Sequence, residues 1–503
     1  MFRILVLTLL AVTVWSQTSE APPENTPDFT PMEPNELQRG GGDDDDGERG
    51  GRGGGGRTPA FNGNASLGIR LMGISPARHE FLSVLALSFG TVLLLNGYDT
   101  TSFVSESVMH SVNARDSSRI GPFAGYYGPS VMYGVYAVAC LLAPWICYKF
   151  GAKWTLFVGS IPFTLYLTNY FYLNLWTYYG AQFLLGFGFA MFNCGQGQYL
   201  SEHSTRETIS RNSVMISALG YQSMLIGGLT LILINWLKPV ESVLPQQSFR
   251  DFSNSEIYII FGVLVISSLF SNLVFAILPT KQFNSLAQKE PAIKATFKNQ
   301  MALIWETTIE KRILCLLPFF MFYGLHTAFW LFVFPTSFSF AKQLSSNHYL
   351  PAYYSIAVST GNVIVGWFIH YKSKKNHSFG LVPAMVTQIV LMSGIYALTV
   401  IALTVIISGL LHGMSECCSA TMRSFVCTIA VPKKRLQAYS VAKIFQSVVT
   451  CIGGALASRL TVFDWIALLL SAQLISCLGF YWSSRNIRKE EESQDDVAKT
   501  IAE

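Results

Sequence analysis

Residues 257–278 read IYIIFGVLVISSLFSNLVFAIL, a run of 22 residues without a single charged side chain. About 20 consecutive apolar residues in a helix span the hydrocarbon core of a bilayer, so we expect this run to cross a membrane. Half of the 503-residue chain is hydrophobic and only 13% is charged, against about 25% in an ordinary soluble domain. This composition excludes a disordered protein, a collagen and a typical soluble enzyme.

Similar apolar runs recur on both sides of this segment. We predict twelve membrane-spanning helices, near residues 81–110, 122–148, 153–172, 176–199, 213–237, 257–278, 313–336, 350–371, 379–395, 397–422, 437–457 and 462–483. The fold class is therefore an all-α membrane protein embedded in the lipid bilayer. The expected parts are an N-terminal six-helix half, a central cytosolic loop, a C-terminal six-helix half and a cytosolic tail, at 81–278, 279–312, 313–484 and 485–503.

The first 80 residues differ in character from the rest. Residues 1–16 resemble a secretory signal, because Arg3 precedes a short apolar run that ends in small residues. Residues 17–66 are rich in Gly, Asp and Pro, and we expect them to be disordered. An Arg-Gly tract at Arg49 resembles RNA-binding segments, but the acidic residues 43–46 offset its charge. We expect no nucleic-acid partner.

The placement of lysine and arginine predicts the orientation in the membrane. If residue 80 faces the cytosol, the inner loops hold most of the cations, including Lys149, Lys153 and residues 433–435. Both termini then lie in the cytosol. We expect the protein to reside in the plasma membrane or in an endomembrane. This conflicts with a cleaved signal, and we give the distributed charge more weight. The glycosylation sequon at Asn64 would then lie on the side where no glycan is added.

The two predicted halves also resemble each other in sequence. Arg211, Gln222 and Ser223 have the same spacing as Arg435, Gln446 and Ser447. Tyrosine pairs at 126–127 and 353–354 and glycine pairs at 227–228 and 453–454 lie at nearly the same offset. Two repeated six-helix units joined by a long central loop describe the major facilitator architecture, in which the halves face each other across a midplane site.

Three motifs point to one branch of that superfamily. Lys149, Gly151, Lys153 and Trp154 lie in the sequence KFGAKWT, between the second and third predicted helices. This turn resembles the K-x-G-x-K-W-T turn of the Unc-ninety-three ("uncoordinated") family. The Gly-rich segment 187–200 is similar to that family's segment ending in Q-x-x-Y-L. The segment from residue 435 to 447 is similar to its R…W-Q-S segment, with Phe where Trp is common.

The resemblance covers roughly residues 81–484 and carries functional expectations. Family members associate with two-pore-domain potassium channels or escort other membrane receptors, so the resemblance implies a regulatory, non-catalytic membrane protein with a membrane-protein partner. The superfamily's usual G-x-x-x-D-R-x-G-R-R signature is degraded here, because Tyr148 and Lys149 replace its Asp-Arg pair. That departure puts ordinary alternating access in doubt.

Charged residues inside predicted spans are functional candidates, because burying charge in a bilayer is costly. Glu416 and Lys443 lie at similar depths in the tenth and eleventh segments, and we hypothesise that they form an ion pair. The pair has either a structural role or a role in gating or proton coupling.

Further polar candidates lie on the first, fourth, fifth and eleventh segments. Asp99 and Glu106 share one helix face, two turns apart. They either line a central cavity, where they would bind a cation or proton, or meet water at the outer rim. The other candidates for a cavity or partner contact are Asn193, Gln196, Gln198, Tyr199, Gln222 and Gln446.

The sequence contains no HExxH, GxSxG or Walker glycine loop, so we expect no catalytic residues, no metal site and no cofactor. Three functional classes remain. The first is a regulatory subunit of an ion channel or another membrane partner. The second is a secondary transporter of a small organic solute or ion, which rests on fold analogy. The third is a trafficking chaperone for membrane receptors.

Overall fold

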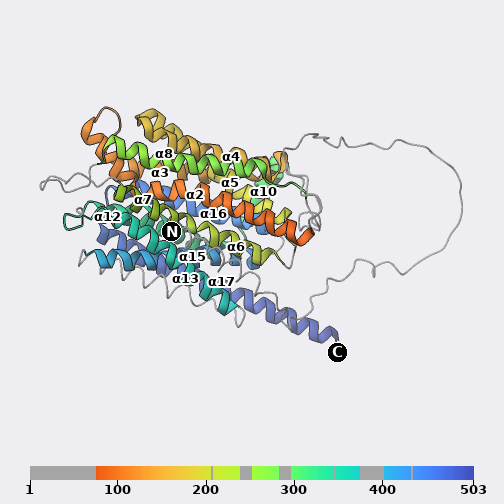
Figure 1. Cartoon of the computed structure of the whole chain (residues 1–503). Coiled ribbons are helices and arrows are strands. Elements are labelled where there is room, and N and C mark those ends of the chain that lie inside the picture. Colours follow the sequence, from red (N-terminus) through yellow and green to blue (C-terminus); the bar gives the residue numbers. More distant parts are fainter. Residues whose placement is uncertain are drawn as a thin grey trace. The chain divides into compact units, whose positions relative to one another are not determined.

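The computed structural model describes residues 75–205, 208–237, 252–281, 296–344, 347–373, 401–431 and 434–502. The long elements within these ranges are all helices, and they run side by side (Figure 1). This confirms the all-α fold class. The signal-like start, the Gly-rich tail, Asn64 and the predicted helix at 379–395 lie outside the described residues, so the count of twelve helices stays a prediction.

The N-terminal helices follow the predicted runs, and local signals fix several of their ends. They are α2 (Pro76–Arg115), α3 (Ala124–Phe150), α4 (Ala152–Thr168), α5 (Leu175–Glu202), α6 (Ile209–Gly220), α7 (Gln222–Leu237) and α8 (Asn254–Ile277). The fixed φ of Pro76 suits the first turn of α2. The Asn174 side chain accepts a hydrogen bond from the Trp176 amide at the start of α5, and Ser253 and Glu256 form a capping box on α8.

The predicted central loop contains a short amphipathic helix, α10 (Phe297–Thr308). The C-terminal part follows with α11 (Lys311–Ala328), the π-helical turn η2 (Phe329–Val333), α12 (Phe334–Ser339), α13 (Leu350–Ser373), α15 (Ala402–Ala430), α16 (Arg435–Ala457) and α17 (Val462–Ala502). Helix α17 extends well past the apolar run that we predicted to end near residue 483.

Two predicted spans are interrupted along their length, and a third, at 153–172, ends in the 3-10 turn η1 (Asn169–Tyr172). The segment at 213–237 divides into α6 and α7 at Tyr221. The segment at 313–336 contains the π turn η2 between α11 and α12. A π turn arises where one extra residue enters the helix, and such turns are frequent at functional sites. Apolar periodicity alone does not reveal either interruption.

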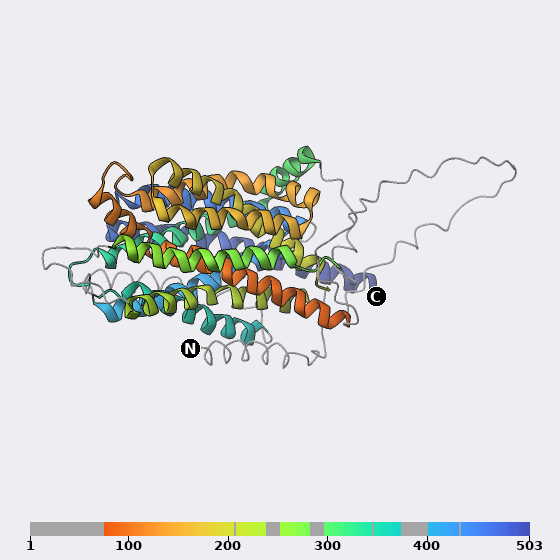
Figure 2. The same ribbon diagram turned by 45° about the horizontal axis from the view of Figure 1, so that its top comes forward.

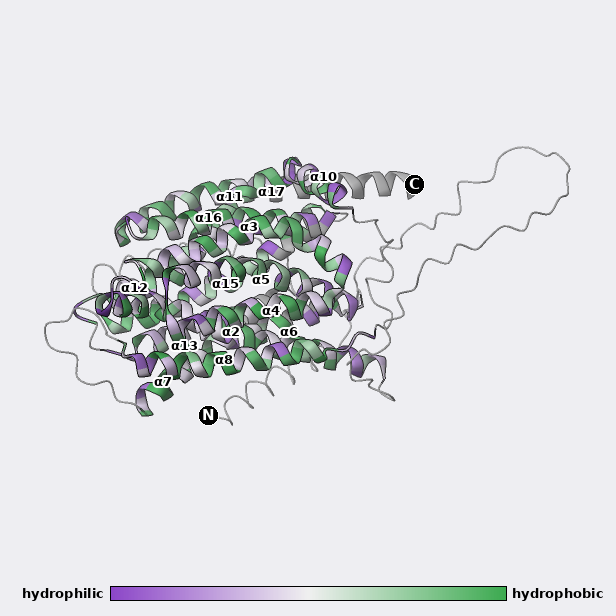
Figure 3. Cartoon of the chain, turned by 90° about the horizontal axis from the view of Figure 1, so that it is seen from above, coloured by the Kyte–Doolittle hydropathy of each residue, from purple (hydrophilic) through white to green (hydrophobic). Residues whose placement is uncertain are grey.

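Eight helical segments in the described ranges are long and apolar enough to cross a membrane. They are Pro76–Arg115, Ala124–Phe150, Arg211–Leu237, Asn254–Ile277, Lys311–Ser339, Ala402–Arg423, Gln437–Ala457 and Val462–Ser483. Figure 3 shows hydrophobic residues along the lengths of the helices and hydrophilic residues near many of their ends. This distribution fits an integral membrane protein.

The helices alternate in direction, so the loops gather at two ends (Figure 2). At the predicted outer end, Arg115 Nη1 donates to the carbonyl oxygen of Phe252 at 2.6 Å. At the predicted inner end, the Tyr199 hydroxyl donates to the carbonyl oxygen of Pro279 at 2.8 Å. This grouping matches the alternation that we predicted. Which end faces the cytosol stays a prediction.

The two predicted halves pack together along two seams, α3 against α16 and α7 against α13. A hydrogen bond crosses the second seam: Ser355 Oγ on α13 donates to the Met224 carbonyl oxygen on α7 at 2.7 Å. A Cβ atom at Gly228 would lie 2.7 Å from Ile356 Cγ1 and 2.8 Å from the Ala352 carbonyl oxygen. A small residue is therefore needed here for the helices to approach closely.

The turn between α3 and α4 depends on Gly151. Its backbone has φ 81° and ψ 160°, a region that is essentially restricted to glycine. The Gly151 amide donates to the Cys147 carbonyl oxygen at 2.8 Å, and its own carbonyl accepts from Thr155 Oγ1 at 2.8 Å. The residue thus ends one helix and starts the next within a single turn.

Replacing Gly151 by Ala should destabilise the protein, because a Cβ atom is strained at this backbone conformation by about 1–3 kcal/mol. We expect a lower thermal unfolding temperature for Gly151→Ala in detergent. Gly180 in α5 has nothing within 4 Å of a built Cβ, so Gly180→Ala is the matched control. Equal unfolding temperatures for the two variants would contradict the role assigned to this turn.

Replacing Gly228 by Leu should force α7 away from α13 and cost about 1–3 kcal/mol through overpacking. We expect a drop in unfolding temperature and in folded yield. Gly262 in α8 has nothing within 4 Å of a built Cβ, so Gly262→Leu should be tolerated. If Gly228→Leu were as stable as that control, the close approach of α7 and α13 at Gly228 would be contradicted.

Candidate functional site

The Glu416 side chain on α15 is held by two aromatic donors from another helix. The Tyr323 hydroxyl on α11 donates to Glu416 Oε1 at 2.5 Å. The Trp330 indole Nε1–H, on the π turn η2, donates to Oε2 at 3.2 Å. Both carboxylate oxygens therefore have a hydrogen-bond donor, which lowers the cost of keeping the charge away from bulk water.

Arg423 lies two turns after Glu416 on the same face of α15. Its side chain is only 5% exposed. One guanidinium nitrogen, Nη1, donates to Gln446 Oε1 on α16. The guanidinium carbon also lies 4.8 Å from the centre of the Tyr323 ring, at cation–π distance. The predicted candidate Gln446 thus anchors a buried arginine, and α11, α15 and α16 are tied together.

Lys443 lies beside this arginine. The Glu416 oxygens accept from Tyr323 and Trp330, and among the described residues no salt bridge joins Glu416 to the Lys443 Nζ. The Lys443 Nζ lies 5.9 Å from the centre of the Tyr439 ring. The two side chains lie within electrostatic range of each other, so the pairing of Glu416 with Lys443 and the functional role of each residue stay predictions.

Asp99 brings a charge from the N-terminal half to the same region. It is 7% exposed, and its Oδ2 accepts a hydrogen bond from Ser223 Oγ at 2.6 Å. Its carboxylate is close enough to Glu416 for the two charges to interact, and Tyr133 interacts with both. We call Asp99, Ser223, Tyr323, Trp330, Glu416, Arg423, Tyr439, Lys443 and Gln446 the central cluster.

Glu106, the other acid predicted on α2, has a different setting. It is 8% exposed, so it does not meet bulk water at the rim. Its carboxylate lies against Gly125 in the first turn of α3. The N-cap residue Phe123 supplies no side-chain cap to that helix, and a negative charge near a helix N-terminus is stabilising. The structure therefore places Glu106 at the junction of α2 and α3.

The remaining polar candidates are not part of the central cluster. Gln196 donates to Thr91 Oγ1 at 2.9 Å and joins α5 to α2. Asn193 and Gln198 bond within α5, to the Phe189 carbonyl at 2.9 Å and to Glu202 at 3.1 Å. Gln222, the first residue of α7, donates back to the Ala218 carbonyl of α6 at 3.4 Å.

Tyr199 belongs to an aromatic stack at the predicted inner end. Its ring centre lies 4.0 Å from that of His203, and His203 in turn stacks on His79 with a centre separation of 5.9 Å. Burial lowers the pKa of His203 to about 4, so this imidazole is neutral at neutral pH. Together with the hydrogen bond from Tyr199 to Pro279, the stack joins the start of the central loop to α2 and α5.

The residues of the α3–α4 turn also lie away from the central cluster. Lys149 Nζ lies 5.5 Å from the centre of the Trp145 ring, and Lys153 Nζ lies 5.8 Å from that of Trp154. Trp154 is 53% exposed. Aromatic rings with cations are typical of membrane–water interfaces, so this turn fits the membrane surface.

Sequence reading missed Arg423, Tyr323 and Trp330. Arg423 fell one residue past the predicted end of its segment at 397–422, although the helix runs to Ala430. A signal was present, because Arg423 follows Glu416 by two helical turns and therefore shares its face. The two aromatic donors carry no comparable signal, since aromatic residues are abundant in every span.

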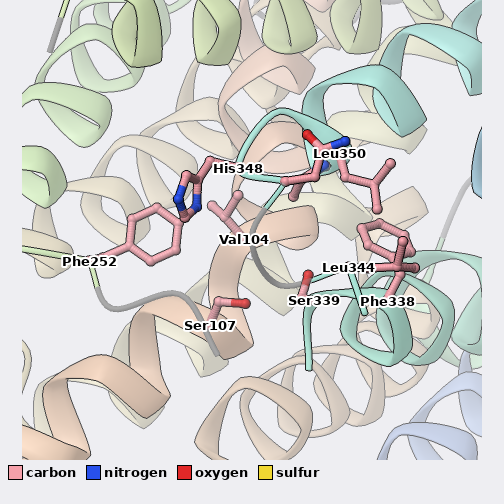
Figure 4. Close-up of a pocket in the computed structure, with 10 residues that line it drawn as sticks. Val104, Ser107, Phe252, Phe338, Ser339, Leu344, His348 and Leu350 are labelled. Carbon is pink, nitrogen blue, oxygen red and sulfur yellow. The ribbon is translucent and has the colours of Figure 1, made fainter. Parts of the chain in front are cut away.

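A small pocket opens at the predicted outer end, between α2 and the segments that follow η2. Figure 4 shows Phe252 and His348 on one side and Phe338, Ser339, Leu344 and Leu350 on the other, with Val104 and Ser107 between them. Asn235 Nδ2 donates to the His348 carbonyl oxygen at 3.1 Å. The pocket therefore lies where the two halves meet and is separate from the central cluster.

Comparison with known folds supports a transporter-like arrangement. The E. coli fucose:proton symporter FucP aligns with a TM-score of 0.55 and 13% identity, over 81% of this chain and 99% of that one. A POT family transporter in complex with 5-aminolevulinic acid aligns with a TM-score of 0.58 and 12% identity, over 80% of this chain and 96% of that one. At such low identity these likenesses concern the fold alone.

Sequence comparison is more specific. The UNC93-like protein MFSD11 of Xenopus tropicalis is 24% identical over 336 residues, which cover 63% of this chain and 71% of that protein. The Xenopus laevis protein of the same name is 24% identical over 217 residues, 43% of this chain and 45% of the relative. The family described as ion channel regulatory protein UNC-93 matches residues 116–404 and 400–481. Because this match covers well over half of the chain, the protein belongs to the UNC-93 family.

Proposed function

We propose that this protein is a secondary transporter of a small polar or charged solute, and that the solute binds at the central cluster. The observation that carries the proposal is the placement of Glu416 and Arg423 among α11, α15 and α16, with hydrogen-bond partners from the two neighbouring helices. Ionisable groups inside a membrane protein are costly, and they mark substrate or ion pathways.

The accessibility of the cluster supports binding rather than packing alone. Arg423 is buried, whereas Glu416 and Lys443 keep part of their side chains accessible although both lie within membrane-spanning segments. Charges with accessible surface at this depth indicate internal space that water or a solute can enter. A protein that contacts its partners only through its outer surface does not need charged residues inside the helix bundle, since apolar residues pack in the bundle interior at lower cost.

The position of the cluster between the halves supports a coupling role. Asp99 and Ser223 come from one half, whereas Glu416 and Arg423 come from the other. A rocking motion of the halves would change the separation of these charges, as alternating access requires. The solved transporters with the same fold are named for proton symport and oligopeptide transport, which supports this reading by analogy.

A second candidate function is regulation of a membrane partner, specifically a two-pore-domain potassium channel. The description of the family as ion channel regulatory proteins favours it, and so does the loss of the Asp-Arg pair at residues 148–149. A third reading, a trafficking chaperone for receptors, would change the amount of a partner at the cell surface. All three describe a non-catalytic integral membrane protein of the plasma membrane or an endomembrane, with both termini in the cytosol.

The transport proposal predicts electrogenic or proton-linked flux in proteoliposomes that hold the purified full-length chain. Organic acids, amino acids, sugars and short peptides should be offered one class at a time while currents and internal pH are recorded. We expect Glu416→Gln to reduce the active flux at least tenfold, because it removes a charge whose hydrogen bonds are worth about 1.5–3 kcal/mol each. Elution volume and unfolding temperature establish that the variant is folded.

Glu306→Gln is the matched control. Glu306 lies on α10, is 61% exposed and pairs with Lys434 at 2.7 Å, and exposed pairs contribute little. The solute flux of the Glu306→Gln variant should equal that of the unmodified protein. Absence of flux for every solute class, together with altered current through a co-expressed potassium channel at constant surface amount, would replace transport by channel regulation. A change only in the partner's surface amount would indicate the trafficking role.

A further inference from the structure

Lys443 stands out in the central cluster because its charge has no direct partner there. In the described part of the chain, Lys443 Nζ has no hydrogen bond and no salt bridge. It lies 5.9 Å from the centre of the Tyr439 ring. The residue lies inside the membrane-spanning segment Gln437–Ala457. Such an ammonium group is costly in a bilayer unless water or a counter-charge reaches it.

A second cation lies on the same ring. The Arg423 guanidinium carbon is 5.3 Å from the centre of the Tyr439 ring. Two positive charges that share one aromatic neighbour repel each other, and a ring contributes only about 0.5–2 kcal/mol to each. Two cationic side chains therefore lie beside Tyr439.

The acids of the cluster do not cancel this charge by contact. Glu416 lies within electrostatic range of Lys443, but its two oxygens accept from Tyr323 and Trp330. Asp99 is held by Ser223 of the other half. The remaining group that interacts with the ammonium is the Cys140 thiol of α3. Within the C-terminal half the cluster thus holds two cations and one carboxylate.

The Lys443 side chain is also not completely covered by its neighbours. It keeps part of its surface accessible, whereas the neighbouring Arg423 is buried and bonded to Gln446. Arg423 is therefore held in place by its bond to Gln446, whereas the Lys443 ammonium donates no hydrogen bond within the described residues. Ammonium groups bind carboxylates through short charge-assisted hydrogen bonds.

We propose that Lys443 is the anion-binding group of the central cluster and that the solute carries a carboxylate, which sits beside Tyr439 between Lys443 and Arg423. This inference rests on the proposed function and adds the chemical class of the substrate to it. The bound carboxylate supplies the negative charge that the C-terminal half lacks. Uncharged and purely cationic solutes would leave the ammonium uncompensated.

The test is a binding measurement on the full-length protein in detergent, with sodium benzoate and sodium succinate as probes and benzamide and succinamide as uncharged analogues. The carboxylates should raise the unfolding temperature in a saturable way, and the amides should not. Lys443→Gln should weaken carboxylate binding about tenfold or more, which corresponds to at least 1.4 kcal/mol. Lys443→Arg keeps the charge and should retain binding.

Two controls separate the ammonium from general charge and folding effects. Lys342→Gln removes an exposed lysine at the predicted outer end and should bind carboxylates as the unmodified protein does. Lys443→Met has similar volume without charge and, in the absence of anions, should unfold at a higher temperature than the unmodified protein. Equal responses to carboxylates and amides, or undiminished binding by Lys443→Gln, would overturn the inference.

Failure of the inference and failure of the proposed function give different results. Flux of uncharged or cationic solutes that is insensitive to Lys443→Gln would overturn the carboxylate assignment and leave transport standing. Carboxylate binding that depends on Lys443, without flux in proteoliposomes, would overturn transport and leave the anion site standing.

Discussion

The structure is constrained most by the need to compensate charges placed inside a membrane. Glu416 and Arg423 are accommodated because aromatic and amide side chains from α11 and α16 satisfy them. Each of these bonds also joins two helices, so the chemistry of the cluster and the packing of the C-terminal half depend on each other. The π turn η2 belongs to the same arrangement, because it carries Trp330.

The packing of the two halves positions this cluster. Close approach at Gly228 joins α7 to α13, and at the predicted outer end the Tyr127 and Ser458 hydroxyls lie 2.9 Å apart across α3 and α16. Asp99 reaches the cluster from the opposite half. A solute bound there would contact both halves, and small changes along the seams would alter how the charges face one another.

The sequence was informative about the fold because its signals are long and repeated. Apolar runs of bilayer length, the connector after residue 278 and the KFGAKWT turn predicted helices and a family that the structure and the comparisons support. The site was harder to predict. Glu416, Lys443 and Asp99 were identified because charged residues are rare in apolar runs, and Gln446 was identified through the internal repeat. The partners of Glu416 are aromatic residues that resemble ordinary core.

The errors have physical causes. The aromatic donors of Glu416 were not predicted, because depth along a helix does not specify which way a side chain points. Arg423 was missed because the predicted segment ended at residue 422, although the helix continues to Ala430. The break at Tyr221 and the π turn at Phe329–Val333 depend on tertiary packing, which periodicity does not encode.

The most direct test of the central claim is an experimental density map of the full-length protein in a lipid nanodisc, prepared with sodium benzoate. The account predicts that Tyr323 and Trp330 donate to Glu416 and that ligand density lies beside Tyr439, between Arg423 and Lys443. A map in which Lys443 forms a direct ion pair with Glu416, with apolar side chains filling the space beside Tyr439, would contradict it.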